Sequence, residues 1–209
     1  MTIGIVASVY GSAYYKFVLP WVARISCLNR QPDRVTIAHD GIPEKYRDAA
    51  GELLEVEWVR SDIPYRLHPQ VNVNAAIAVT ETDWIAKVDI DDLLFAHALD
   101  GINDSLADVV NFGYRIGDTD CPSRVVSAHE VLQKNNNAIG SCSPFRRWIW
   151  EANPFEDYLY DDWRFWIKAA RAGAAFTATG RTDYIYRVHP DQITRRYDNA
   201  KAFQEIQDL

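Results

Sequence analysis

The sequence predicts an α/β fold with a mostly parallel sheet flanked by helices, and two observations lead to this prediction. Short apolar runs rich in β-branched residues recur through residues 1–115, with stretches of helical spacing between them. Strands that alternate with helices are typical of a parallel sheet. The chain has 209 residues and is 48% hydrophobic, so we expect a single domain over residues 1–209 with a sizeable core.

The elements of the first half follow in order from the amino terminus. We expect a buried strand over residues 2–10 and a helix over residues 14–29, which Pro20 either kinks or delays. A second helix is expected over residues 71–81. The remaining strands are expected over residues 34–41, 53–60, 83–89 and 107–115.

The last third of the chain is less regular. Two further strands are expected over residues 138–147 and 183–189, with a helix over residues 161–173 between them. Gly173 ends that helix, because glycine readily adopts the left-handed conformation found just after helices. This region forms a smaller mixed part of the same domain.

Composition and charge exclude several classes of protein. The net charge of −7 argues against a main role in non-specific binding to nucleic-acid backbones. Cys27, Cys121 and Cys142 are odd in number and widely spaced, so we expect neither a disulfide framework nor a zinc knuckle. No apolar run approaches the roughly 20 residues of a membrane span, and no basic leader opens the chain. We therefore expect a cytoplasmic protein.

Polar side chains gather where the expected strands end. The carboxyl ends of parallel strands meet at one edge of an open sheet, and ligands bind there. The first strand ends at Ser8, Val9 and Tyr10, the second at Asp40, the fourth at Asp89, Asp91 and Asp92, and a late strand at His189. One cleft should therefore hold several acids and one histidine.

A divalent cation explains why three carboxylates lie within residues 89–92. Mg²⁺ takes oxygen ligands from one or two carboxylates and from substrate phosphates, and Mn²⁺ also accepts imidazole. A D-x-D pattern after a strand, with a distant histidine, thus indicates a site for a nucleoside diphosphate. The alternative is that Asp91 and Asp92 cap a helix that begins near Leu93.

Five segments resemble, in order, motifs of the family 2 glycosyltransferases, which have the GT-A fold. Together they span residues 3–194. The segments are IGIVASVYG, RVTIAHDG, NVNAAIAVTETDWIAKVDIDD, YDDWRFWIKAARAG and YIYRVHPDQIT. The resemblance implies an inverting, metal-dependent glycosyltransferase with residues 1–115 as the nucleotide-sugar-binding half and residues 116–209 as the acceptor-binding and catalytic half.

The resemblance also implies roles for the donor-side residues. The chain would bind a nucleotide-diphosphate sugar as its donor, and Asp91 and His189 would bind Mn²⁺ or Mg²⁺. Asp92 either supports the site as a neighbour of Asp91 or caps a helix. Asp40 has an alternative role as a turn residue before Gly41, and His189 has one as an ordinary histidine before Pro190. The implied donor-binding residues are Ser8, Val9, Tyr10, Asp40, Asn74, Lys87 and Asp89.

Asp162 is the expected general base. Inverting transfer needs a carboxylate that takes the proton of the acceptor hydroxyl as the oxygen attacks the anomeric carbon. The resemblance places Asp162 in that role and Asp161 where the family usually has glutamate. An acidic pair in the first turn of a helix also stabilises the helix by itself, and Glu156 or Asp157 would be the base if the alignment shifts.

The sequence departs from the family pattern at the donor and leaves the acceptor open. Val73 stands where an arginine is usual, so Lys87 or Arg187 would supply the positive charge for the diphosphate. The short stretch after Thr194 suits an enzyme that adds one sugar to a soluble acceptor: a glycan, a protein, a small molecule or a modified nucleic-acid base. Candidate acceptor contacts are Trp148, Trp150, Tyr158, Tyr160, Trp163 and Trp166, with the basic pairs Arg146–Arg147 and Arg195–Arg196. Phe165 and Trp166 should be largely buried.

Two other functions fit the predicted fold. A sugar nucleotidyltransferase usually has a glycine-rich, basic loop after its first strand, but residues 8–17 contain a single Gly and a single Lys. A non-catalytic nucleotide-sugar-binding module would not need Asp91, Asp162 and His189 together. The sequence does not specify the oligomeric state.

Overall fold

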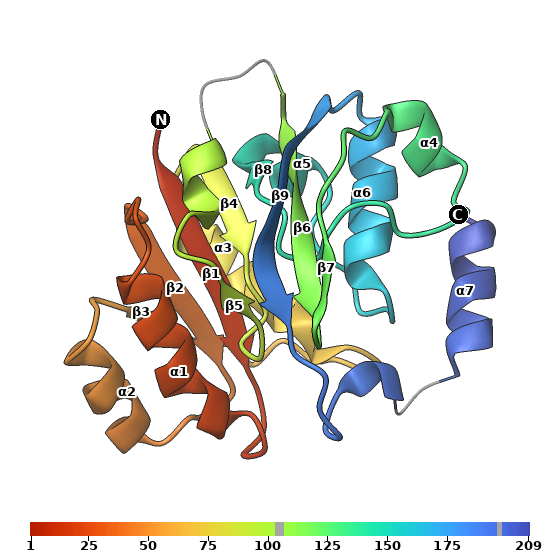
Figure 1. Cartoon of the computed structure of the whole chain (residues 1–209). Coiled ribbons are helices and arrows are strands. Elements are labelled where there is room, and N and C mark those ends of the chain that lie inside the picture. Colours follow the sequence, from red (N-terminus) through yellow and green to blue (C-terminus); the bar gives the residue numbers. More distant parts are fainter. Residues whose placement is uncertain (103–106, 196–197) are drawn as a thin grey trace.

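A computed structural model describes residues 1–102, 107–195 and 198–209 of the chain (Figure 1). Its centre is a nine-stranded sheet in the order β3-β2-β1-β4-β8-β6-β9-β5, with β7 paired to β6. The strands are β1 Ile3–Val9, β2 Arg34–His39, β3 Glu57–Arg60, β4 Trp84–Lys87, β5 Leu93–Leu94, β6 Val109–Ile116, β7 Thr119–Cys121, β8 Phe145–Arg146 and β9 Phe176–Tyr186.

The sheet has a parallel part and a mixed part. Strands β3, β2, β1 and β4 are parallel neighbours. β8 then runs antiparallel to both β4 and β6, while β9 is parallel to β6 and antiparallel to β5. This arrangement confirms the predicted α/β fold with its smaller mixed region, and it puts the ends of β1, β2 and β4 at one edge of the sheet (Figure 1).

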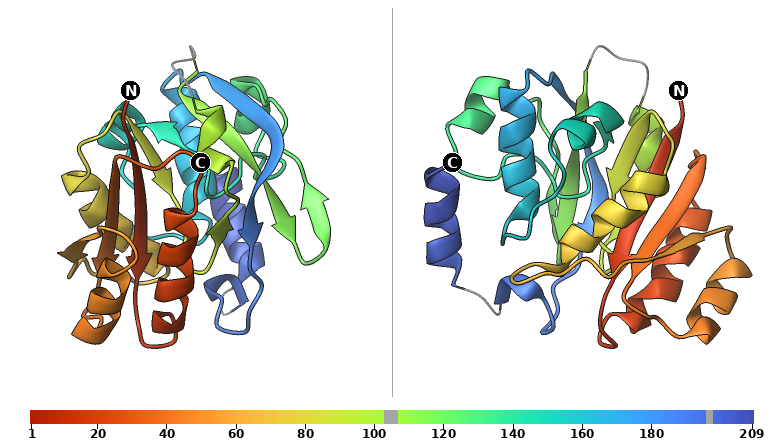
Figure 2. Two further views of the ribbon diagram at one scale, coloured as in Figure 1. Left: turned by 60° about the vertical axis from the view of Figure 1, so that its left-hand side comes forward. Right: turned by 180° about the vertical axis from the view of Figure 1, so that it is seen from behind.

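Helices cover both faces of the sheet (Figure 2). α1 and α2 pack on one face, and α3, α5 and α6 pack on the other, with α4 and α7 outside α6. The helices are α1 Tyr15–Ser26, α2 Glu44–Gly51, α3 Val73–Val79, α4 Ala128–Leu132, α5 Arg147–Ala152, α6 Asp161–Arg171 and α7 Asn199–Gln207, and the 3₁₀ turns are η1 Pro69–Asn72, η2 Ala98–Gly101 and η3 Ile193–Arg195.

Alternation along β1 explains why the sheet is buried on both faces. Ile3, Ile5 and Ala7 join the core under α1, whereas Val6 joins the core under α3 and α6 on the opposite face of the sheet. All seven residues of β1 are buried. A strand covered on both sides reads as a continuous apolar run, which is the pattern that predicted it.

Several predicted boundaries need correction. The expected helix over residues 71–81 starts as the 3₁₀ turn η1 and ends at Val79, and the third strand is confined to Glu57–Arg60. The expected strand over residues 138–147 is mostly loop, with only Phe145–Arg146 in the sheet. α1 continues through Pro20, because Pro20 lies on the solvent side, where water can hydrate the carbonyl that loses its partner.

The described part of the chain contains no helix with the length and apolar character needed to cross a lipid bilayer.

Candidate active site

The segment after β4 carries the acids that the sequence singled out. Leu93–Leu94 forms strand β5 rather than a helix, so the interpretation of Asp91 and Asp92 as helix caps is wrong. Asp92 is 2% exposed, and its Oδ1 accepts a hydrogen bond of 3.0 Å from the backbone N–H of Arg187. Burial, together with the neighbouring Asp91 and Asp89, raises the pKa of Asp92 well above its usual range. Asp92 therefore fastens the β4 loop to the segment that follows β9.

Asp91 and His189 meet although 98 positions separate them in the sequence. His189 lies three residues after β9, and its Nε2 is 2.7 Å from Oδ2 of Asp91. Both side chains are mostly buried, at 13% and 11% exposed. Asp91 lines a small cavity of about 70 Å³, and the His189 ring packs against Phe17 with centroids 4.9 Å apart. The expected meeting of strand ends thus brings these two side chains together.

The donor atoms of this pair fit a divalent cation that substrate helps to bind. Among the described residues, no group of three or more His, Cys, Asp or Glu side chains could enclose a metal ion. Asp91 offers a carboxylate and His189 an imidazole side by side, which Mn²⁺ accepts, and phosphates commonly complete such sites. A cation held here would have two protein ligands and would need a diphosphate for its remaining ligands.

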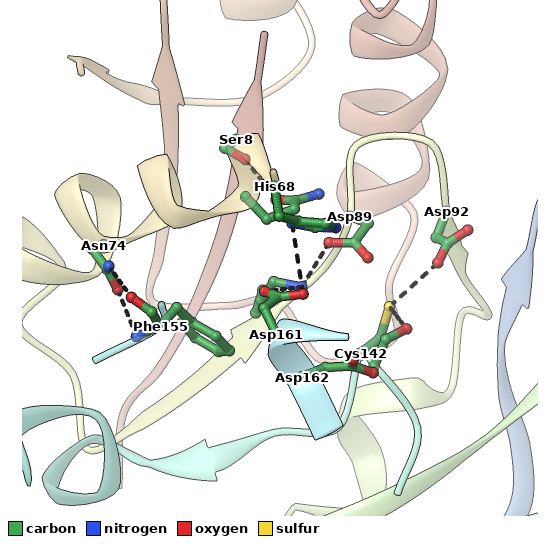
Figure 3. Close-up of polar contacts among 12 residues, drawn as sticks. Ser8, His68, Asn74, Asp89, Asp92, Cys142, Phe155, Asp161 and Asp162 are labelled. Atoms are coloured by element: carbon green, nitrogen blue, oxygen red, sulfur yellow. Dashed lines mark hydrogen bonds and ion pairs between the residues drawn. The ribbon is translucent and has the colours of Figure 1, made fainter. Parts of the chain in front are cut away.

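A buried cluster of opposite charges includes Asp89, which lines the same small cavity as Asp91, and Asp161 (Figure 3). Lys87 is 2% exposed, and its Nζ is 2.9 Å from Oδ1 of Asp89 and 3.9 Å from Oδ2 of Asp161. Burial lowers the pKa of Lys87, but Asp89, Asp161 and Asp162 outweigh burial and raise it, so Lys87 stays charged. His68 completes the cluster with its Nδ1 3.7 Å from Oδ1 of Asp161.

Asp162 follows Asp161 at the start of α6 and faces a larger cleft. Its Oδ2 accepts a hydrogen bond of 2.8 Å from Nδ2 of Asn137. Burial and the nearby Asp161 raise the pKa of Asp162 to about 6, against the opposing effect of Lys87. A carboxylate that is ionised at neutral pH and has a raised pKa is suited to accept a proton.

The other two candidate bases are engaged elsewhere. Both oxygens of Asp157 accept hydrogen bonds from the consecutive backbone N–H groups of residues 66–68. Glu156 pairs with Lys168 at 2.7 Å and with Arg164 at 3.5 Å. Neither acid lines the cleft, so of the four candidate bases only Asp161 and Asp162 line it.

The predicted donor residues of the first two strands differ in their accessibility. Ser8 and Val9 are each 1% exposed, and Oγ of Ser8 donates to Oε1 of Gln70 at 2.6 Å. Any contact they make with a donor would therefore run through the backbone. Tyr10 lines two cavities, and burial raises its pKa. Asp40 is exposed at the end of β2 and accepts a hydrogen bond of 2.9 Å from the N–H of Gly11.

Asn74 links α3 to α5 and to the segment that follows α5. Its Nδ2 donates to the carbonyl of Phe155, while its Oδ1 accepts from Nε1 of Trp150 and from the N–H of Phe155 (Figure 3). Its donor-binding role stays a prediction. Arg187, the alternative source of positive charge, donates to the backbone carbonyl of Asp91 and lies over the Phe17 ring.

Three cavities follow one another along this edge of the sheet. An outer cavity of about 340 Å³ shares Tyr10, Tyr14 and Ile193 with the small cavity beside Asp91. The small cavity shares His68, Asp89 and Tyr186 with a cleft of about 580 Å³ that contains Asp162. The order along this path is thus Tyr10, the Asp91–His189 pair, the Lys87 cluster and Asp162.

The expected acceptor aromatics divide into lining and packing residues. Tyr160 and Trp163 line the cleft, and Phe165 and Trp166 are buried at 2% and 1% exposed, as expected. Trp148 and Trp150 donate hydrogen bonds to Asp108 and Asn74, and Tyr158 lies under Arg164. None of these three lines the cleft.

Of the basic pairs, Arg146, Arg147 and Arg195 do not line the cleft. Arg147 donates to backbone carbonyls at the end of α3, including that of Ile77 at 2.8 Å, and Arg146 lies over the Trp84 ring. Arg195 is exposed, and Arg196 lies outside the described residues.

Sequence reasoning missed three residues that matter at the site. His68 and Asn137 lie in loops without a recognisable motif, and Asp157 was considered only as a base. The run of three asparagines at residues 135–137 was the one signal in the sequence that could have pointed to the cleft wall.

Comparison with known proteins supports this fold. A crystal structure of S. aureus TarS 1–349 superposes with a TM-score of 0.71 at 14% identity, covering 88% of this chain and 60% of that one. The chain has a GT-A-like glycosyltransferase fold. It matches no family model and no curated protein sequence.

Structures of TarS with ligands are similar as well. The complex of TarS 1–349 with UDP has a TM-score of 0.68 at 15% identity, over 91% of this chain and 61% of that one. The complex with UDP-GlcNAc has a TM-score of 0.71 at 16% identity, over 99% of this chain and 64% of that one. This chain therefore spans less than two thirds of the TarS fragment that it matches.

Proposed function

We propose that this chain is an inverting glycosyltransferase of family 2 that moves a sugar from a nucleotide-diphosphate sugar to an acceptor hydroxyl. The observation that carries the proposal is the path of three cavities, with the Asp91–His189 pair in its middle and Asp162 in the cleft at its end. Such a path matches the order of a nucleoside, a diphosphate, a sugar and an acceptor. The three free cysteines suit a reducing compartment, and we propose the cytoplasm.

The donor would lie along the first part of this path. The outer cavity beside Tyr10 and Gly11 would hold the nucleoside, with Asp40 within reach of a base N–H. The small cavity beside Asp91 would hold the diphosphate. TarS, which has a similar fold, has been crystallised with UDP and with UDP-GlcNAc, and this likeness supports a nucleotide sugar as the donor.

Asp91 and His189 would hold Mn²⁺ or Mg²⁺ together with the donor diphosphate. The bound cation would neutralise the negative charge that develops on the departing diphosphate. The two residues bring a carboxylate and an imidazole to the same point, and Asp92 fixes the loop on which Asp91 lies. The protein thereby positions the diphosphate before transfer.

Asp162 would take the proton of the acceptor hydroxyl. As that proton moves to the carboxylate, the acceptor oxygen forms a bond to the anomeric carbon, and the bond from this carbon to the diphosphate oxygen breaks with its electron pair. Asn137 orients the Asp162 carboxylate from one side. Lys87 pairs with the adjacent acids Asp89 and Asp161, while burial and the neighbouring Asp161 raise the pKa of Asp162 to about 6.

The proposal can be tested with a screen of UDP-, GDP-, CDP- and dTDP-sugars, with and without Mn²⁺. We expect one donor to raise the melting temperature only when Mn²⁺ is present, because a ligand that binds the folded state stabilises it. Asp91→Asn should remove that Mn²⁺-dependent shift. The exposed Asp100, which lines none of the three cavities, provides the matched control Asp100→Asn, which should keep the shift.

Product analysis distinguishes sugar transfer from the two alternative functions, a non-catalytic binding module and a nucleotidyltransferase. Slow release of the nucleoside diphosphate from the identified donor is expected for a transferase without acceptor. Binding without any release would favour a non-catalytic module, and synthesis of the nucleotide sugar from a nucleoside triphosphate would favour a nucleotidyltransferase. Donor binding that is unchanged in Asp91→Asn would overturn the proposed metal site.

A further inference from the structure

The cleft beyond Asp162 is large enough for a substrate of its own. Its volume of about 580 Å³ lies within the range of ligand pockets in proteins. The Lys87 cluster and Asp162 lie along one side of this cleft, and its other walls come from β6, the loop before residue 142, and α7. If the proposed function holds, the acceptor binds here.

Charge limits what this cleft can accept. Its lining includes three acids, Asp89, Asp161 and Asp162. Among the described residues of the lining, Lys87 is the one lysine and no arginine occurs. Lys87 is buried and held 2.9 Å from Asp89, so it offers no free cation to a ligand. A phosphate or carboxylate on an acceptor would therefore enter a region of negative charge without a counter-ion.

The walls offer aromatic surface instead. Phe203 on α7 is 42% exposed, and Tyr114 on β6 is 37% exposed. The Phe203 ring packs against Trp163 with centroids 5.8 Å apart, which fixes its orientation. Tyr160 lies on the same side, because its hydroxyl donates to Oδ1 of Asn199 on α7. Exposed aromatic rings that are held in place provide flat apolar surfaces beside polar groups.

Amide groups also line this cleft. The left-handed conformation of Lys134, with φ of 56°, ends the α4 segment and leads into residues 135–137. Asn137 is bound to Asp162, whereas the side chains of Asn135 and Asn136 make no hydrogen bond within the described part of the chain. Both line the cleft and are exposed. An amide offers one acceptor and two donor hydrogens without net charge.

We propose that the acceptor is an uncharged carbohydrate. One of its rings packs its C–H face on Phe203, its hydroxyls bond to Asn135 and Asn136, and its reacting hydroxyl points to Asp162. This inference rests on the proposed function and adds the class of acceptor. It also makes α7 a specificity element, because α7 supplies Phe203 and is held by the hydrogen bond of Gln207 Nε2 to the Lys134 carbonyl at 2.7 Å.

Saturation-transfer NMR on the full chain tests this inference. The probes are a panel of neutral methyl glycosides and their 6-phosphates, offered after donor binding has been verified. We expect at least one neutral glycoside to bind and its 6-phosphate to bind at least about tenfold more weakly. Phe203→Ala should weaken the neutral probe about tenfold. Gln204→Ala, at the exposed neighbouring position on α7 outside the cleft, should leave binding unchanged.

A charge-introducing variant tests the same idea in the opposite direction. Asn136→Lys should gain binding of the 6-phosphates, because it places a free cation in a wall that has none among the described residues. The inference is overturned if the unaltered chain prefers the 6-phosphates, if no neutral glycoside binds while the donor does, or if Phe203→Ala has no effect. Loss of donor binding would instead count against the proposed function.

Discussion

On the side of the molecule that we propose binds the donor (the donor side), the charged residues lie beyond the ends of parallel strands, whereas on the proposed acceptor side they lie in loops and at the start of one helix. Asp40 follows β2 directly and Asp91 lies in the loop that follows β4, so the order of the strands decides where they lie. Asp162 and Asn137 reach each other only because α6 packs under the loop over residues 133–144. The strand order of the sheet therefore sets the positions of the donor-side residues, whereas packing between distant segments sets the positions of the acceptor-side residues.

The largest effect expected from this comparison concerns the base. Asp162→Asn should lower kcat by about 10³-fold, because removal of a general base typically costs two to four powers of ten. Donor binding should be unchanged, since Asp162 lies in the cleft and outside the two donor cavities. Steady-state rates and donor titrations would measure the two effects separately.

The control for this variant is Glu156→Gln. Glu156 is paired with Lys168 and Arg164 outside the cleft, and its loss should leave kcat within about twofold. A large loss of rate in Glu156→Gln, with Asp162→Asn still active, would assign the base to the segment before α6 and contradict our interpretation.

The next largest effect concerns the charge cluster where the two sides meet. Lys87→Met should lower the free energy of unfolding by about 3–5 kcal/mol, because it leaves Asp89 and Asp161 buried without their cation. Urea denaturation would measure the change. Lys168→Met, which removes the half-buried partner of Glu156, should have a much smaller effect. Equal losses in the two variants would show that burial of the Lys87 cluster contributes nothing.

The smallest effect concerns the stability of the chain at different pH values. The pKa of Asp162 is raised to about 6 in the folded state, above its ordinary value of 3.8, so its ionisation destabilises the fold. This loss is absent below about pH 4, grows between pH 4 and pH 6, and is complete above that range. Asp162→Asn should therefore be more stable than the unaltered chain by about 1–2 kcal/mol at pH 7.5.

Denaturation at pH 4 and pH 7.5 would test this prediction. The advantage of Asp162→Asn should disappear at pH 4, where the aspartate is protonated in both the folded and the unfolded chain. A difference of the same size at both pH values would instead indicate that the substitution acts through packing. A functional acid that destabilises its own fold is common at active sites.

The donor side could be predicted from the sequence because its signals are local. An apolar run followed by Asp89, Asp91 and Asp92 gives the position of a strand and of its carboxyl end, and the rule for parallel sheets then brings His189 to the same place. The helix that begins at Asp161 was predicted for the same reason, from its spacing and its acidic first turn.

The acceptor side could be predicted only in part because its contacts are long-range. Asn74 resembles a donor-binding residue by its place in a motif, yet its side chain bonds to Phe155, 81 positions away. The strand expected over residues 138–147 is mostly loop, because β8 pairs with β4 over only two residues. Phe203 reaches the cleft through the packing of α7, which no pattern in the sequence indicates.

The carboxylate of Asp157 joins three consecutive amides of the loop before η1 to the chain four residues ahead of α6. His68, which touches Asp161, is one of the residues so tied. We therefore expect the loop over residues 66–68 and the start of α6, which carries the proposed base Asp162, to move together whenever a bound donor displaces the loop.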